Sequence, residues 1–214
     1  SAGFSYGMDK SLGGGLMGLF AYYVSSPLNL LYLLVPVKHY HFVAAFLLFL
    51  KIVLACVFFN FFIEHKYPGM RWAGVALALG YGFMSYNFAY AQNIMWHDVM
   101  LLLPLLCYSV DKIIQGGRNT AYTIILALAI LANFYIAYMV CLFLVVYFVY
   151  SMLLQGWQKT PSHTESIAAR WKRSAFSFVG GSLLAGGISA ALLLPALFNS
   201  GQAKGGLFDY TFST

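Results

Sequence analysis

The chain has 214 residues, of which 61% are hydrophobic and only 8% are charged, and its mean hydropathy is +0.77. Soluble globular domains carry roughly 25% charged residues, so this composition excludes a fully solvated surface and indicates an integral membrane protein. The net charge of +6 is distributed between apolar runs and forms no continuous basic stripe, which argues against nucleic acid as a partner and is typical of a membrane topology signal.

The first 40 residues predict short helices instead of a full membrane span. The apolar run from Leu16 to Val37 is interrupted by Pro27 and Pro36, whereas a spanning helix needs about 20 predominantly apolar residues. We therefore expect residues 1–40 to form an outer loop, an interfacial or re-entrant helix, a turn and a second short helix.

Residues 41–199 predict about six membrane segments. Four of them are continuous apolar runs, at His41–Phe62, Trp72–Ala91, Met95–Val110 and Ser174–Leu197. The run from Ala121 to Leu154 is too long for one ordinary span, and Asn133 divides it into a short arm and a longer arm. The expected fold is all-α: a polytopic transmembrane helical bundle with short or re-entrant helices. Residues 1–214 form one domain in this prediction, with residues 200–214 beginning another outer loop.

The positive charges predict which ends of these segments face the cytoplasm. Eight of the twelve Lys and Arg residues fall in the loops Glu64–Arg71, Asp111–Asn119 and Gln155–Arg173. Positively charged loops face the cytoplasm, so Ala121–Leu154 must cross the membrane an even number of times. The outer regions are then the stretch through Tyr40, the connection from Gln92 to Asp98, and the C-terminal residues.

Asp98 is the most informative outer residue, because it lies at the start of an apolar helix and follows Trp96 and His97. A carboxylate in this position could act as a general base or a metal ligand. The helix dipole also stabilises a carboxylate in the first turn, which is a purely structural explanation. Asp9 could approach Asp98 on the same face of the membrane.

Lys51 lies near the middle of the His41–Phe62 segment, about 15 Å below its outer end. A charge at this depth is energetically costly and indicates a functional site by default. Lys51 could face a cavity and meet an anionic group such as a lipid phosphate, which we favour. It could instead extend to the interface or pair with a carboxylate such as Asp98.

The other polar residues of the outer regions are weaker candidates, because residues near water are often polar without a further role. Gln92, Asn93 and His39 belong to this group, and His39 with His41 makes only a weak metal-binding pattern. We expect the amide of Asn133 to form hydrogen bonds between helices.

Four stretches together resemble the YfhO family of bacterial membrane proteins, through their order and spacing. They are SYGMDKSLGGG, AYYVSSPLNLLYLLVP, NIMWHDVMLLLPLLCYSVDKII and ILANFYIAYMVCLFLVVYF. The resemblance implies a GT-C type fold and a glycosyltransferase that takes sugar from a polyprenyl-phosphate carrier on the outer face. The implied acceptor is a cell-envelope polymer such as teichoic acid. The family's first membrane helix and its acidic motif would precede Ser1, so we expect an N-terminal membrane portion without that helix.

This resemblance and the positions of the polar residues together define the candidate site. An enzyme that uses a polyprenyl-phosphate sugar needs a cation for the phosphate and a carboxylate near the acceptor hydroxyl. The candidate catalytic residues are Asp98 and Asp9, and the candidate substrate-binding residues are Lys51, His97, Trp96, Asn93, Gln92 and His39. No metal ligands are assigned, although a divalent metal is compatible with the resemblance. The alternative function is a transporter or lipid flippase, in which Lys51 and the broken helices line a substrate path.

Overall fold

The computed structural model describes residues 28–157 and 167–205, which form helices joined by short connections, with no strand among them. In chain order the elements are the 3-10 helices η2 (Leu28–Leu34) and η3 (Val37–His39), the α-helices α2 (Tyr40–Lys66), α3 (Arg71–Gly82) and α4 (Ser85–Ala89), the 3-10 helix η4 (Ile94–Trp96), and α5 (His97–Ile114), α6 (Thr120–Ala132), α7 (Phe134–Trp157) and α8 (Ile167–Gly205). The predicted all-α class is confirmed.

Three stretches within the described residues are long and apolar enough to cross a membrane: Tyr40–Lys66, Ile94–Ile114 and Phe134–Leu154. They contain three of the predicted segments. Their outward faces carry large apolar side chains, such as Phe49 on α2, which is 67% exposed, and Val146 on α7, which is 68% exposed. Such surfaces suit lipid and are rare on soluble proteins. The predicted Ser174–Leu197 segment lies within α8, which is not among these three.

The predicted Trp72–Ala91 span is wrong as one continuous helix, because α3 ends at Gly82 and α4 begins only at Ser85. With 12 residues, α3 is about 18 Å long, short of the roughly 30 Å hydrocarbon core. The amide of Asn87 donates a 2.7 Å hydrogen bond to the carbonyl of Gly82. This buried side chain satisfies a carbonyl that the helix leaves without a partner, and so stabilises the break.

α3 packs closely on α2 through the small residues Gly74, Ala78 and Gly82, which are spaced one helical turn apart and are buried. A Cβ atom on Gly82 would overlap the Sγ atom of Cys56. A larger residue than glycine at this position would therefore require the Cys56 side chain to move.

The expected break at Asn133 is present, but its amide acts differently from the prediction. Asn133 is in an extended conformation between α6 and α7. Its Oδ1 atom accepts a 3.0 Å hydrogen bond from the backbone N–H of Ile136. Asn133 thus caps the N-terminus of α7. Its side-chain oxygen does not form the expected hydrogen bond between helices.

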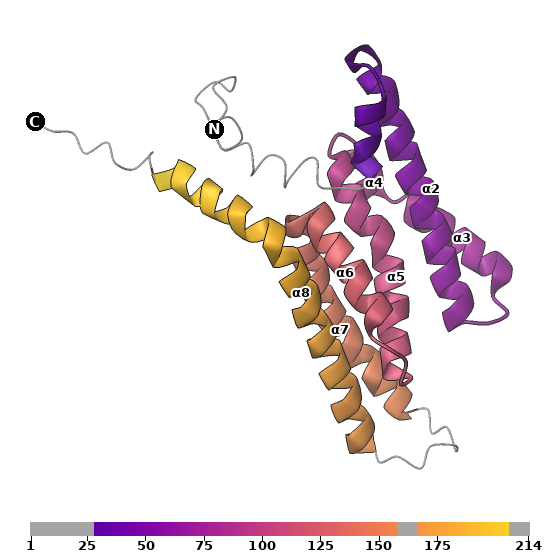
Figure 1. The fold of residues 1–214 in the computed structure, drawn as a ribbon. Helices are drawn as coiled ribbons and strands as arrows, with labels where there is room; N and C mark the ends of the chain where they lie inside the picture. The colour runs from indigo at the N-terminus through magenta and orange to yellow at the C-terminus, as the bar shows by residue number, and fades with distance from the viewer. Residues whose placement is uncertain (1–27, 158–166, 206–214) are drawn as a thin grey trace, which may run out of the picture.

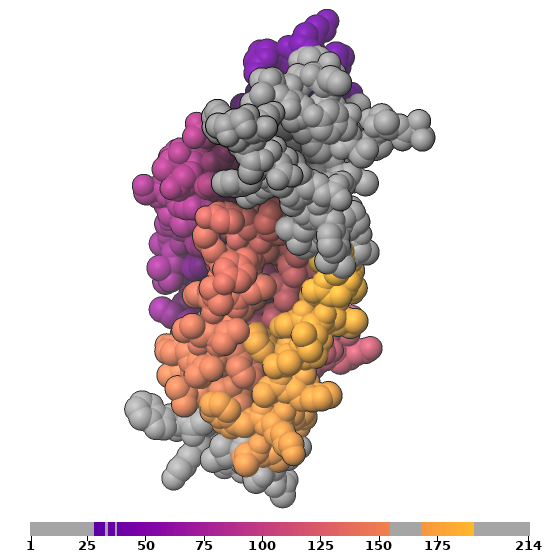
Figure 2. All heavy atoms as spheres, turned by 90° about the vertical axis from the view of Figure 1, so that its left-hand side faces the viewer, coloured from indigo at the N-terminus to yellow at the C-terminus, as the bar shows by residue number. Residues whose placement is uncertain are grey.

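The core lies around α5, which packs against α2, α6, α7 and α8. A cluster of buried apolar residues there includes Val99, Leu106 and Val110 of α5. α8 lies against α6, where a Cβ atom on Gly181 would come within 3.0 Å of Tyr122, so the two helices pack closely at this glycine. Gly180, Gly186 and Gly187 approach no neighbour in this way. Figure 2 shows the surface of α8 beside that of α6 and α7.

The described helix ends that flank the basic connections lie at one end of the molecule. In Figure 1 the C-terminal ends of α2, α5 and α7 and the start of α8 lie toward the lower end, and the N-terminal ends of α2 and α5 lie toward the upper end. An ion pair of 3.1 Å between Lys66 and Asp111 joins the lower ends of α2 and α5. The lower end is the one that the charge pattern predicts to be cytoplasmic.

Candidate functional site

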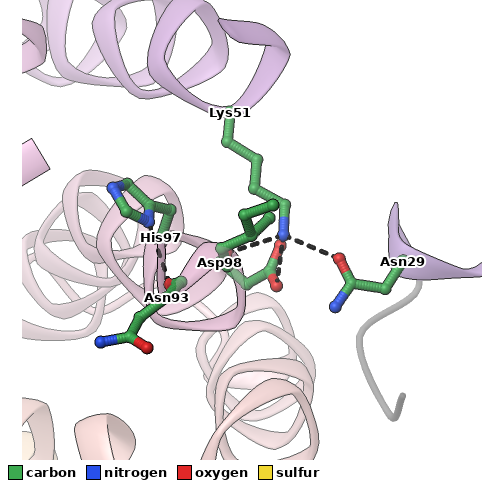
Figure 3. Close-up of polar contacts among 6 residues, drawn as sticks. Asn29, Lys51, Asn93, His97 and Asp98 are labelled. Carbon is green, nitrogen blue, oxygen red and sulfur yellow. Dashed lines mark hydrogen bonds and ion pairs between the residues drawn. The ribbon is translucent and has the colours of Figure 1, made fainter. Parts of the chain in front are cut away.

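A buried ion pair between Lys51 and Asp98 forms the centre of the candidate site (Figure 3). The Nζ atom of Lys51 donates to Oδ2 of Asp98 at 2.8 Å, to Oδ1 of Asn29 at 3.0 Å and to the backbone carbonyl of Ile94 at 3.0 Å. An ammonium group has three N–H donors, so each has an acceptor here. The cluster joins η2, α2, η4 and α5.

The local sequence explains how the two charges meet. Lys51 follows Leu47 and precedes Ala55 at intervals of four residues, so the three lie on the buried face of α2. Asp98 lies in the first turn of α5, where the helix dipole favours a carboxylate. Lys51 is 1% exposed and Asp98 is 4% exposed. Of the alternatives considered for Lys51, the structure shows the pair with Asp98.

His97 lies beside this pair and is also buried. Its Nδ1 and Nε2 atoms are each 3.3 Å from a backbone carbonyl oxygen, those of Asn93 and Asn87 respectively. The ring thereby connects α4 and the residue before η4 to the start of α5.

An apolar cavity of about 460 Å³ lies next to the first turn of α5. It is lined by aromatic and aliphatic side chains of α4, η4, the start of α5 and α7, among them Tyr86, Trp96, Met100, Tyr135 and Phe143. Trp96 packs between Tyr90 and Tyr135, with ring centroids 5.2 and 6.3 Å away. Trp96 and Asp98 are two residues apart, so they project from opposite sides of the chain here. The cavity and the ion pair therefore flank the same turn.

The remaining candidate residues are distributed less closely. Asn93 contacts the site through its backbone carbonyl, and Gln92 is exposed in the connection before η4. His39 is exposed and precedes α2, twelve residues and therefore about 18 Å from Lys51. Asp9 lies outside the described residues. Within the described ranges, no group of three or more His, Cys, Asp or Glu side chains could hold a metal ion.

Two amides complete the site without having been predicted as site residues. Asn29 lies in the stretch AYYVSSPLNLLYLLVP, one of the four that resemble the YfhO family, and its side chain accepts from Lys51. The backbone carbonyl of Asn87 lies 3.3 Å from Nε2 of His97, and its side chain stabilises the end of α3. A polar residue in an apolar run was the available signal in both cases.

Comparisons with known proteins agree with the membrane architecture. A family model described as "Bacterial membrane protein YfhO" matches residues 1–214. A curated relative, "Uncharacterized protein YfhO" of Bacillus subtilis (strain 168), is 28% identical over 158 residues, which are 73% of this chain and 17% of that protein. The chain therefore spans only a small part of the relative's length. No solved structure gives a significant match.

Proposed function

Because the chain belongs to the YfhO family of bacterial membrane proteins, we propose that it forms part of a membrane glycosyltransferase. The proposed reaction moves a sugar from a polyprenyl-phosphate donor to a cell-envelope polymer such as teichoic acid, on the outer face of the membrane. The observation that carries this proposal is the buried Lys51–Asp98 pair beside an apolar cavity.

The ion pair supports a function because it is a costly way to hold two helices together. Burying two charges removes their hydration, and well-packed apolar residues of similar volume often give equal or greater stability. Ionisable groups within membrane segments are accordingly rare and mark substrate sites. This argument applies to Lys51 and Asp98, because each is ionisable and is almost fully buried within an apolar segment.

The cavity supports a lipid-linked substrate in particular. A polyprenyl phosphate combines a long apolar chain with a charged head, so its site needs an apolar surface next to polar groups. The aromatic cavity of about 460 Å³ would hold part of the isoprenoid chain. The phosphate and sugar would lie toward the first turn of α5, where Lys51, His97 and Asp98 are found.

In the proposed reaction, an acceptor hydroxyl oxygen attacks the anomeric carbon of the sugar. The bond between that carbon and the phosphate oxygen breaks, and the polyprenyl phosphate leaves with the electron pair. Asp98 or Asp9 takes the hydroxyl proton, and Lys51 offsets the charge on the departing phosphate. Lys51 already has three acceptors, so the phosphate would replace Asn29 or the Ile94 carbonyl.

The test is glycosyl transfer by the full-length protein from an isotope-labelled polyprenyl-phosphate sugar. Asp98→Asn and Lys51→Ala should each lower transfer by about 100-fold or more, the range for losing one proton-transfer or charge-stabilising group. Glu64→Gln, which changes an exposed carboxylate on α2, is the matched control and should retain activity. Normal transfer by Asp98→Asn at normal expression would remove Asp98 from the mechanism. Movement of the labelled lipid across the membrane without transfer would support the flippase alternative.

A further inference from the structure

The three N–H donors of the Lys51 ammonium group are all occupied in this structure. A phosphate oxygen can therefore bind the same nitrogen only by replacing one of the three acceptors. These acceptors are Oδ2 of Asp98, the backbone carbonyl of Ile94 and Oδ1 of Asn29. The fold holds them with different firmness, and this difference indicates which one a ligand would replace.

Two of the acceptors belong to one firmly held part of the fold. Ile94 and Asp98 lie in the continuous apolar stretch Ile94–Ile114, and α5 contributes to the apolar core. The carbonyl of Ile94 also accepts from the backbone N–H of His97. Asp98 carries the charge that compensates Lys51. Moving the Ile94 carbonyl would disturb the packed start of α5, and moving Asp98 would deprive a buried ammonium of its counter-ion, which is strongly unfavourable.

The third acceptor is held less firmly. Asn29 lies on η2, a 3-10 helix of 7 residues that packs chiefly on α2. Such long runs of 3-10 helix are uncommon, because their hydrogen-bond geometry is poorer than that of an α-helix. Among the side chains of η2 that the structure describes, only Asn29 is buried, whereas Leu30 and Leu34 are 48% and 82% exposed. Asn29 is also uncharged, so its removal from Lys51 leaves the charge balance of the buried pair unchanged.

We propose that the phosphate of the lipid-linked donor binds Lys51 in the place of Asn29, and that η2 moves away from α2 when it does. This inference rests on the proposed function, in which Lys51 offsets the charge of that phosphate. In Figure 3 the side chain of Asn29 extends from η2 to the lysine nitrogen, and its Oδ1 atom, 3.0 Å from Nζ, marks the position of one phosphate oxygen. Without a donor, the amide satisfies the third N–H of a buried ammonium, as buried polar groups require.

The experiment is native mass spectrometry of the full-length protein with a polyprenyl phosphate and with the corresponding polyprenol, which lacks the phosphate. Asn29→Ala should tighten binding of the polyprenyl phosphate about tenfold, because the ligand no longer displaces a hydrogen bond to a charged group. Binding of the polyprenol should change by less than about twofold. Leu30→Ala is the matched control, because it shortens a neighbouring exposed side chain of η2, and it should leave both affinities within about twofold of the wild type.

The direction of the change separates displacement of Asn29 from a supporting role in binding. If Asn29 stays in place and helps to bind the donor, Asn29→Ala weakens the binding of polyprenyl phosphate. Weaker or unchanged binding by this variant would overturn the inference and leave the proposed function standing. A wild type that binds the polyprenol as tightly as the polyprenyl phosphate would overturn both, because Lys51 would then not recognise a phosphate.

Hydrogen exchange in the wild type tests the movement of η2 without any substitution. The backbone amides of residues 28–34 should exchange about threefold faster or more with polyprenyl phosphate than with polyprenol, because η2 loses its buried contact with Lys51. Equal or slower exchange would show that η2 stays on α2 when the phosphate binds, and would overturn the inference.

Discussion

Replacing either member of the Lys51–Asp98 pair should destabilise the protein strongly, whereas replacing both should not. Asp98→Leu leaves the ammonium of Lys51 with only the oxygens of Asn29 and Ile94, and Lys51→Met leaves a buried carboxylate. Breaking a buried pair from one side costs about 3–5 kcal/mol, because the charge that stays in the interior loses its counter-ion. The double variant Lys51→Met/Asp98→Leu contains no buried charge and should regain most of the lost stability.

Equilibrium unfolding in mixed micelles of the wild type, the two single variants and the double variant measures these differences as a double-mutant cycle. The same four proteins are then assayed for glycosyl transfer. We expect the double variant to be stable and inactive, which separates the chemical role of the pair from its structural role. A double variant as unstable as the single variants would refute the electrostatic reasoning. A stable double variant that still transfers sugar would show that the pair only holds the helices together.

Three further predictions concern the fold. Asn133→Ala removes the cap of α7 and should lower the free energy of unfolding by about 1 kcal/mol; an unchanged unfolding curve would contradict the capping role. Gly82→Ala should cost about 1–3 kcal/mol, because the new Cβ meets the sulfur of Cys56, and adding Cys56→Ala should restore most of the loss. In cells, a membrane-impermeant thiol reagent should label Gln92→Cys from outside but not Arg118→Cys, in a protein without native cysteines; the reverse pattern would invert the predicted topology.

Features that depend on composition and on isolated polar residues could be predicted from the sequence. The break at Asn133 could be predicted because an amide interrupts a long apolar run and the basic loops require an even number of crossings. The depth of Lys51 could likewise be counted from the start of its segment, and Asp98 was among its possible partners.

Features that depend on packing could not be predicted in the same way. The Trp72–Ala91 run contains no charge or proline, so its hydropathy does not indicate the break after Gly82, which depends on the side chain of Asn87. The position of Asn29 against Lys51 depends on how η2 folds over α2, and no periodicity in so short a segment specifies it. A polar cavity of about 340 Å³ lies where α2, α5, α7 and α8 meet at the basic end, and no local sequence pattern reveals such a meeting point.

The sequence separation of the buried pair also has a consequence during synthesis. Lys51 leaves the ribosome 47 residues before Asp98, which corresponds to about 2–10 s at the usual rate of translation. During that interval α2 must enter the membrane with its lysine unmatched, a state that costs about 2.5–3.5 kcal/mol at the centre of a helix and that the surrounding Phe and Leu residues must offset. Insertion of α5 then supplies Asp98 and removes this free-energy cost. The ion pair would therefore favour the packing of α2 against α5.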